Sequence, residues 1–151
     1  MDLQHYVDDR VEDGIFRIDR AVYSDPELFE LEMAAFFEHG WVFLAHESQL
    51  REPGSFYSTH MGRQPVFLVR QVDGTVKCFV NACAHRGSML VSTRRGKANV
   101  FTCRYHGWVY GQDGACMKIR DERGGGYPSG MNRSQFGLTQ IPRLSSYGGF
   151  L

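Results

Sequence analysis

The hydrophobic pattern of the first forty residues predicts one amphipathic helix. Ser24 or Asp25 can cap its start, and Pro26 fits the first helical turn. Gly40 is placed to end it. Apolar residues between them recur at helical spacing and predict one packed face, made of Leu28, Leu31, Ala35 and Phe36 and widened by Phe29, Met33 and Phe37.

From residue 41 onward the pattern changes to short apolar runs separated by turn residues. Residues 41–45 predict a buried strand, and residues 66–70 predict a stronger one. Asp73-Gly74 and Asp113-Gly114 are two-residue hairpin signals, each next to a strand-like run. The pattern therefore predicts a mainly β fold of antiparallel sheets, preceded by one helix.

The last thirty residues differ from the rest. Residues 120–123 are charged, residues 124–130 are Gly-rich as in a flexible linker, and residues 138–144 resemble a strand. We expect three parts: an N-terminal arm and helix at 1–40, a cofactor-binding domain at 41–120, and at 121–151 a linker and the start of a region leading to an absent domain.

Two short motifs carry the predicted chemistry. Residues 81–87 read N-A-C-A-H-R-G, and residues 101–108 read F-T-C-R-Y-H-G-W. Each offers one thiolate and one imidazole, Cys83 with His85 and Cys103 with His106. In a Rieske-type [2Fe–2S] site two cysteines hold one iron and two histidines hold the other. These four residues are thus the predicted metal and cofactor ligands, held on a tip of two hairpin loops, and no catalytic residue is predicted.

Charge counting predicts the redox behaviour of such a site. Two ferric ions, two sulfides, two thiolates and two neutral imidazoles sum to zero, so the oxidised site accepts an electron more readily than a site with four thiolates. High-potential Rieske proteins carry an extra cysteine in each loop, and the matching residues here are Ser88 and Tyr105. Trp108 stands where a hydroxyl donor is common. We therefore expect a potential near the bottom of the Rieske range.

A structural zinc site with two cysteines and two histidines is the alternative for the same residues. Zinc sites usually show Cys–Cys and His–His pairs rather than two mixed pairs, so the iron–sulfur interpretation is favoured. Cys78 and Cys116 lie in strand-like apolar runs and are expected to be buried free thiols. The remaining histidines lack partner spacing; they are His5, His39, His46 and His60.

Composition excludes several functions. Lys and Arg together number 17, as do Asp and Glu, and this neutral balance argues against a nucleic-acid partner. No apolar run approaches the roughly 20 residues of a membrane span, and the polar N-terminus is unlike a signal peptide. A cytoplasmic location is expected. The basic residues at 94–97 are either a solvated turn or a docking patch for an acidic electron donor.

The chain resembles the N-terminal portion of the large (α) subunit of aromatic-ring-hydroxylating dioxygenases, nearest to the benzoate, toluate and anthranilate group. Besides both cysteine–histidine loops, the supporting stretches are D-P-E-L-F-E-L-E-M at 25–33, A-H-E-S at 45–48, G-R-Q-P-V at 62–66 and S-Y-G-G-F-L at 146–151. Arg104-Tyr105 departs from the group, where Pro-Phe is frequent. This departure weakens assignment to one substrate.

The resemblance implies a function for a larger enzyme. An NADH-dependent reductase or a ferredoxin would reduce the Rieske centre through Cys83, His85, Cys103 and His106. The electron would leave by an imidazole edge for a mononuclear non-haem iron in a neighbouring α subunit, where O2 dihydroxylates an aromatic acid. A small β subunit is a further expected partner. The catalytic domain would follow Leu151, so this chain alone should not hydroxylate.

Two other functions remain open from sequence. A stand-alone Rieske-type ferredoxin would carry electrons without belonging to an oxygenase, but such carriers begin close to their first strand, whereas about forty residues come first here. A zinc-stabilised interaction module would be colourless.

Overall fold

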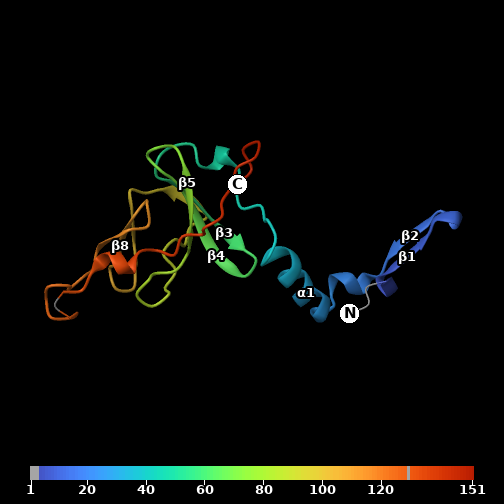
Figure 1. Cartoon of the computed structure of the whole chain (residues 1–151), viewed down its shortest axis with the longest axis horizontal. Helices are drawn as coiled ribbons and strands as arrows, with labels where there is room; N and C mark the ends of the chain where they lie inside the picture. The colour runs from blue at the N-terminus through green and yellow to red at the C-terminus, as the bar shows by residue number, and fades with distance from the viewer. Residues whose placement is uncertain (1–3, 129) are drawn as a thin grey trace. The chain divides into compact units, whose positions relative to one another are not determined.

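The computed structural model describes residues 4–128 and 130–151 (Figure 1). The chain divides into two compact units, Met1–Val42 and Phe43–Leu151. The expectation that the N-terminus is unlike a signal peptide concerns in large part residues 1–3, which lie outside the described residues. Ser129 of the Gly-rich stretch also lies outside them. Among the described residues, no helix is long and apolar enough to cross a membrane.

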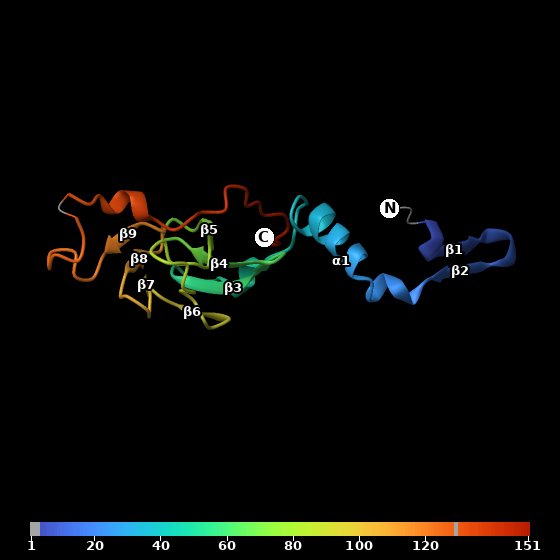
Figure 2. The ribbon, with the colours of Figure 1, turned by 90° about the horizontal axis from the view of Figure 1, so that it is seen from below.

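The first unit contains a small hairpin followed by helical turns (Figure 2). Strands β1 and β2 pair antiparallel from Val7↔Ile18 to Arg10↔Ile15. The elements in order are η1 (Gln4–Tyr6), β1 (Val7–Arg10), η2 (Val11–Asp13), β2 (Ile15–Ile18), η3 (Arg20–Tyr23), α1 (Pro26–Glu32) and the π-helical turn η4 (Met33–Phe37).

The predicted helix begins where expected. The Asp25 carboxylate accepts hydrogen bonds from the backbone N–H groups of Glu27 and Leu28 at 2.8 and 3.0 Å, so Asp25 is the capping residue. Gly40 follows the last turn, and a Cβ there would lie 2.5 Å from the carbonyl oxygen of Phe36. That contact explains why a glycine stands at this end.

The prediction of one packed apolar face is wrong. Leu28 and Met33 are buried, but Leu31 is 43% exposed and Phe36 is 65% exposed. For Phe36, a change of helix type contributes: from Met33 onward the turn is π-helical, and the N–H of Glu38 bonds to the Met33 carbonyl in the i→i+5 pattern. The wider turn moves residues 33–37 off the stripe that α-helical spacing predicts.

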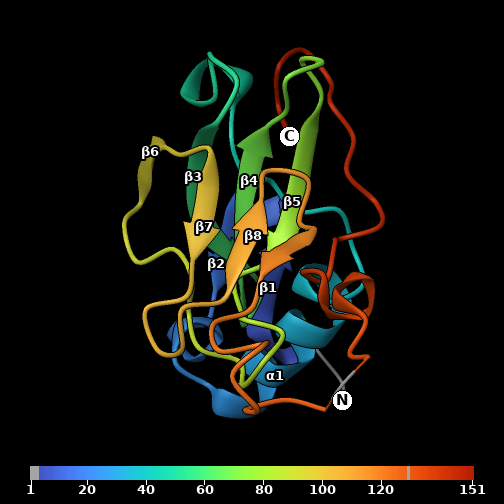
Figure 3. The same ribbon diagram turned by 90° about the vertical axis from the view of Figure 1, so that its left-hand side faces the viewer.

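The second unit is built from two antiparallel sheets (Figure 3). One has the order β5-β4-β3-β6 and the other the order β7-β8-β9. Its elements are η5 (Glu47–Gln49), β3 (Ser55–Met61), β4 (Gln64–Arg70), β5 (Val76–Val80), β6 (Arg95–Lys97), β7 (Val100–Thr102), β8 (Val109–Gly111), β9 (Cys116–Lys118) and η6 (Arg133–Phe136). The mainly β fold of antiparallel sheets is confirmed.

Aromatic side chains join the two sheets into one core. The rings of Phe67 on β4 and Phe101 on β7 have centroids 4.9 Å apart, and Phe56 on β3 meets Phe101 edge to face. Phe79 and Tyr110 belong to the same buried cluster. Burying several aromatic side chains dominates the stability of a domain of this size, so this cluster fixes how the two sheets pack.

Residues 41–45 do not form the predicted strand. Leu44 and Ala45 are buried, but Phe43 is 61% exposed. The N–H groups of Leu44 and Ala45 bond to the carbonyl oxygen of Leu151 instead of entering a sheet. Residues 138–144 likewise make only an isolated bridge, Phe79↔Gln140, on the free edge of β5. Apolar content alone could not distinguish residues 41–45 and 138–144 from strands of a sheet.

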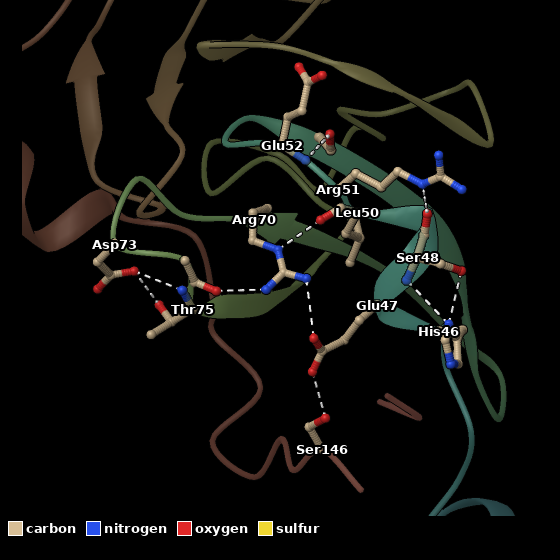
Figure 4. A network of polar contacts seen from close by, with 12 residues as sticks. His46, Glu47, Ser48, Leu50, Arg51, Glu52, Arg70, Asp73, Thr75 and Ser146 are labelled. Atoms are coloured by element: carbon tan, nitrogen blue, oxygen red, sulfur yellow. Dashed lines mark hydrogen bonds and ion pairs between the residues drawn. The ribbon is translucent and has the colours of Figure 1, made fainter. Parts of the chain in front are cut away.

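A polar network fastens the C-terminal segment to the rest of the second unit (Figure 4). The guanidinium of Arg70 donates to the carbonyl oxygens of Leu50 and Gly74 at 2.7 and 2.6 Å. Its remaining nitrogen lies 3.5 Å from the carboxylate of Glu47, which also accepts from the Ser146 hydroxyl at 2.6 Å. One arginine therefore links β4, η5 and the last residues of the chain.

The basic run at 94–97 is exposed to solvent, but most of it lies in a strand rather than in the expected turn. Residues Arg95–Lys97 form the edge strand β6. Arg94 donates to the Tyr57 hydroxyl at 2.9 Å, and Lys97 pairs with Glu52. Two of its three cations therefore serve contacts within the second unit.

Candidate iron–sulfur site

Strand ends deliver both cysteine–histidine loops. The first follows β5, which ends at Val80, and the second lies between β7 and β8. Asn81 fastens the first loop: its side-chain oxygen accepts from the N–H groups of Leu90 and Val91, and its amide donates to the Val91 carbonyl. Sequence reasoning gave Asn81 no role, although a buried asparagine beside a ligand motif is a usable signal for such a brace.

The two loops share one backbone conformation. The N–H of Cys83 bonds to the Ser88 carbonyl at 2.8 Å, and that of Cys103 bonds to the Trp108 carbonyl at 2.7 Å. The N–H of each glycine returns to the carbonyl of the cysteine four residues earlier. Gly87 and Gly107 have φ of 70° and 69°, a region that only glycine enters without strain.

The four predicted ligands lie together in two like pairs. Cys83 and Cys103 are 3% and 2% exposed and interact with each other, whereas both histidines are half-buried. The His85 and His106 rings have centroids 4.6 Å apart. The sulfurs therefore face the protein interior, and the imidazoles lie nearer the surface.

An aromatic stack holds the ring of His85. The Trp108 indole lies parallel to the imidazole, with centroids 4.9 Å apart and 5° between the planes. Trp108 donates its indole N–H to the Tyr127 hydroxyl at 3.0 Å, which fixes the indole in turn. Burial, and then the charges of His106 and Arg86, lower the pKa of His85, so its imidazole is neutral near pH 7.

Each sulfur has its own set of hydrogen-bond donors. The Tyr110 hydroxyl lies 3.0 Å from the sulfur of Cys83, and the backbone N–H of His85 also donates to that sulfur. Cys103 interacts with the N–H groups of His106 and Tyr105. Burial raises the pKa of Cys83. For Cys103, burial also acts to raise the pKa, but these N–H groups together with hydrogen bonds to the side chains of Cys83 and Ser88 outweigh it and lower the pKa. No signal in the sequence pointed to Tyr110, because it lies on β8 just after the second motif but contacts the first.

The donor atoms of the two loops fit a two-iron cluster. Within residues 4–128 and 130–151, no group of three or more His, Cys, Asp or Glu side chains converges as one metal ion requires. The Nδ1 atom of His85 is buried and has no hydrogen-bond partner, as a nitrogen awaiting a metal would be. Two sulfurs on one side and two imidazoles on the other match the donor set of a Rieske cluster.

Cys78 and Cys116, the other two cysteines, are buried free thiols, as expected. Cys78 lies on β5 and Cys116 on β9. Burial raises the pKa of Cys78 to about 12, which keeps it an unreactive thiol.

Fold and site together define an iron–sulfur protein of the Rieske type. Residues 40–141 match the family described as the Rieske [2Fe-2S] domain, and the chain belongs to that family. The [2Fe–2S] cofactor expected from the sequence is thereby confirmed.

Relatives narrow the class further. The chain is 44% identical over 151 residues to the α subunit of toluate 1,2-dioxygenase from Pseudomonas putida, covering 97% of this chain and 33% of that protein. It resembles the solved structure of naphthalene 1,2-dioxygenase from Rhodococcus sp. with a TM-score of 0.80, 32% identity, and coverage of 88% and 30%. A quaternary ammonium Rieske monooxygenase matches with a TM-score of 0.74, 28% identity, and coverage of 86% and 34%.

The resemblance to large subunits of ring-hydroxylating dioxygenases is therefore confirmed. The chain spans about a third of the length of the relatives it matches.

Proposed function

We propose that this chain is the electron-transfer portion of an aromatic-ring-hydroxylating dioxygenase α subunit, with Cys83, His85, Cys103 and His106 as the cluster ligands. The supporting observation is the burial gradient at the tip, where the sulfurs lie inside and the imidazoles lie nearer the surface. The cluster, when bound, supplies a one-electron couple. The histidine side is then the shorter route for an electron leaving the domain.

The chain's own residues prepare this route. Trp108 holds the plane of His85, and the braced loops keep the two histidine rings next to each other. Fixed ligands reduce the rearrangement that accompanies each electron transfer. Residues 41–120 would form the cluster-binding domain. Residues 1–40 would form an N-terminal arm and helix, and residues 121–151 a linker and the start of the region leading to a catalytic domain.

The rest of the pathway is proposed from the relatives. An NADH-dependent reductase or a ferredoxin would donate electrons, and a mononuclear iron in a neighbouring α subunit would receive them. The description of the quaternary ammonium monooxygenase names inter-subunit electron transfer for that protein, which supports the proposed direction. The substrate would be an aromatic acid, as toluate is for the P. putida relative. A small β subunit and a cytoplasmic location complete this proposal.

Spectroscopy of anaerobically purified chain tests the proposal. We expect iron and acid-labile sulfide in equal amounts, a visible absorption spectrum, and a Rieske-type EPR signal after reduction. Adding NADH and a reductase of a benzoate-type system should produce the same EPR signal. Zinc in place of iron, or a dihydrodiol formed from an aromatic acid by this chain alone, would each contradict it.

A further inference from the structure

The formal charge of the chain is divided unequally between its two units. Residues 1–42 contain eleven acidic and three basic side chains, whereas residues 43–151 contain six acidic and fourteen basic ones. The first unit, called the arm below, therefore carries a formal charge of −8, and the second, the cluster unit, carries +8. The zero net charge of the whole chain conceals this division.

The β1–β2 hairpin of the arm exposes an apolar face. Val7 is paired with Ile18, and Asp9 is paired with Phe16. Directly paired side chains lie on the same face of a sheet and alternate along each strand, so these four share one face. Val7 and Ile18 are each 46% exposed and Phe16 is 65% exposed. Two antiparallel strands alone are marginally stable in water, so packing this face against another surface would stabilise the hairpin.

Carboxylates lie on and beside this apolar face. Asp9 belongs to the face, and Glu12 follows in the turn between the strands; both are exposed. Arg10 pairs with Asp8 and Asp13, whereas Asp9 and Glu12 form no ion pair among the residues that the structure describes. A surface that complements the hairpin must therefore combine apolar area with positive charge.

The cluster unit of a second copy offers both properties. Arg104 is followed by Tyr105, Lys118 is preceded by Met117, and all four side chains are exposed. Arm and cluster unit carry equal and opposite formal charges, so two copies can neutralise each other without a further protein. Opposite charges of this size attract over a distance and guide the encounter of the two surfaces.

We propose that the arm of one copy binds the cluster unit of a second copy, with the apolar face of the hairpin in the contact and Asp9 and Glu12 paired with cations. The contact is independent of the proposed electron-transfer function. An oxidised cluster with two thiolates adds no net charge, so the attraction is the same with and without it.

Cross-linking a mixture of labelled chains tests the contact directly. All three lysines, Lys77, Lys97 and Lys118, lie in the cluster unit. A carbodiimide joins a carboxylate to an amine without a spacer, so a link from an arm carboxylate to a lysine forms only where the two units meet. Chains labelled with nitrogen-14 and nitrogen-15 are mixed at high salt and transferred to low salt. We expect linked pairs of one light and one heavy peptide; pairs of a single label only would overturn the proposal.

Sedimentation of the nuclease-treated full chain measures the strength of association. Charges are screened beyond roughly 30 Å at about 10 mM salt and beyond roughly 3 Å at about 1 M. At low salt we expect a mass above the 17.2 kDa of one chain. The dissociation constant should rise at least about tenfold at high salt, because screening removes the attraction between the units. A mass of one chain at low salt, or an association that salt does not change, would overturn the proposal.

Variants of exposed arm residues separate the charges from the apolar contact. Asp9→Asn combined with Glu12→Gln should raise the dissociation constant about fivefold, as expected for two exposed ion pairs. Arg17→Gln makes the arm more acidic and should lower it. Phe16→Ser should raise it, and Val11→Ser is its matched control, because Val11 is 81% exposed but lies outside the paired strands.

Equal effects of Phe16→Ser and Val11→Ser, or no effect of the charge variants, would overturn the proposed contact. All these variants should keep the iron and sulfide of the wild-type chain. Failure of the contact is therefore distinguishable from failure of the proposed function, which absence of a cluster would show.

Discussion

The two cluster loops have the same backbone but different surroundings. Each is closed by a hydrogen bond from the cysteine N–H to the carbonyl five residues later, and each turns at a left-handed glycine. The histidine stands two residues after Cys83 but three residues after Cys103. The two loops thus share a backbone conformation but carry their histidines at positions that differ by one residue.

The surroundings separate the loops further. The first receives side chains from elsewhere, since Tyr110 contacts Cys83 and Trp108 stacks on His85. In the second, Cys103 accepts hydrogen bonds from the backbone N–H groups of Tyr105 and His106, and it also interacts with the side chains of Cys83 and Ser88 in the first loop. Backbone N–H groups of the same loop therefore contribute more at Cys103, whereas the first loop is held more by side chains from elsewhere in the fold.

The largest expected effect is the same in both loops. Cys83→Ser and Cys103→Ser should each abolish cluster binding, because an alcohol is a far poorer iron ligand than a thiolate. Cys116→Ala is the matched control, being a buried cysteine on β9, and it should retain iron and colour. Metal analysis and visible absorption measure the outcome; normal iron content in either serine variant would refute the ligand assignment.

Exchanging a histidine for cysteine should lower the potential in either loop. His85→Cys and His106→Cys each replace a neutral ligand with a thiolate, so the oxidised site changes from zero to one negative charge. We expect the midpoint to fall by on the order of 100 mV, towards the values of all-cysteine clusters. His85→Cys also loses the stack on Trp108 and should hold its cluster less firmly.

Redox titration measures that fall, and the exposed His60 supplies the control variant His60→Cys. A midpoint unchanged in His85→Cys or His106→Cys would show that the residue does not bind iron.

Glycine substitutions test the shared backbone. Gly87→Ala and Gly107→Ala each force a side chain into the left-handed region, at a cost of about 1–2 kcal/mol in the free energy of unfolding. Gly107→Ala should cost slightly more, because its Cβ would lie 3.2 Å from Cδ of Arg120, whereas the space at Gly87 is open. Urea denaturation measures both. Gly125→Ala is the control, because Gly125 also has positive φ but lies outside both loops. It should show the destabilisation caused by backbone strain without a loss of bound cluster.

The smallest expected effect concerns the thiols of the metal-free chain. The folded pKa of Cys83 is raised, so its stabilising contribution is present below the unfolded pKa and is lost as pH rises through the folded value. The folded pKa of Cys103 is lowered, so its contribution is present above the unfolded pKa and is lost as pH falls through the folded value.

Between pH 7 and pH 10, therefore, Cys83→Ser should lose less stability than wild type, and Cys103→Ser should lose more. Denaturation at the two pH values measures this. Carbon-13 shifts of the cysteine Cβ atoms should show Cys103 ionising first, and the reverse order would contradict the assignment.

Sequence reasoning predicted the elements that depend on local chemistry. Asp25 caps the helix, and the mixed Cys–His pairs come together. It failed where apolar runs had more than one possible partner. Residues 41–45 were expected in a sheet, but Leu44 and Ala45 bond to Leu151.

The sequence by itself predicted the four candidate ligands and the charge of the oxidised site, because residue type and spacing are local properties. Only the tertiary structure decided that the sulfurs face inward, that Trp108 holds His85, and that Tyr110 serves Cys83. These contacts join residues brought together by strand pairing and core packing. No periodicity or motif along the chain encodes which hydroxyl will lie against which sulfur.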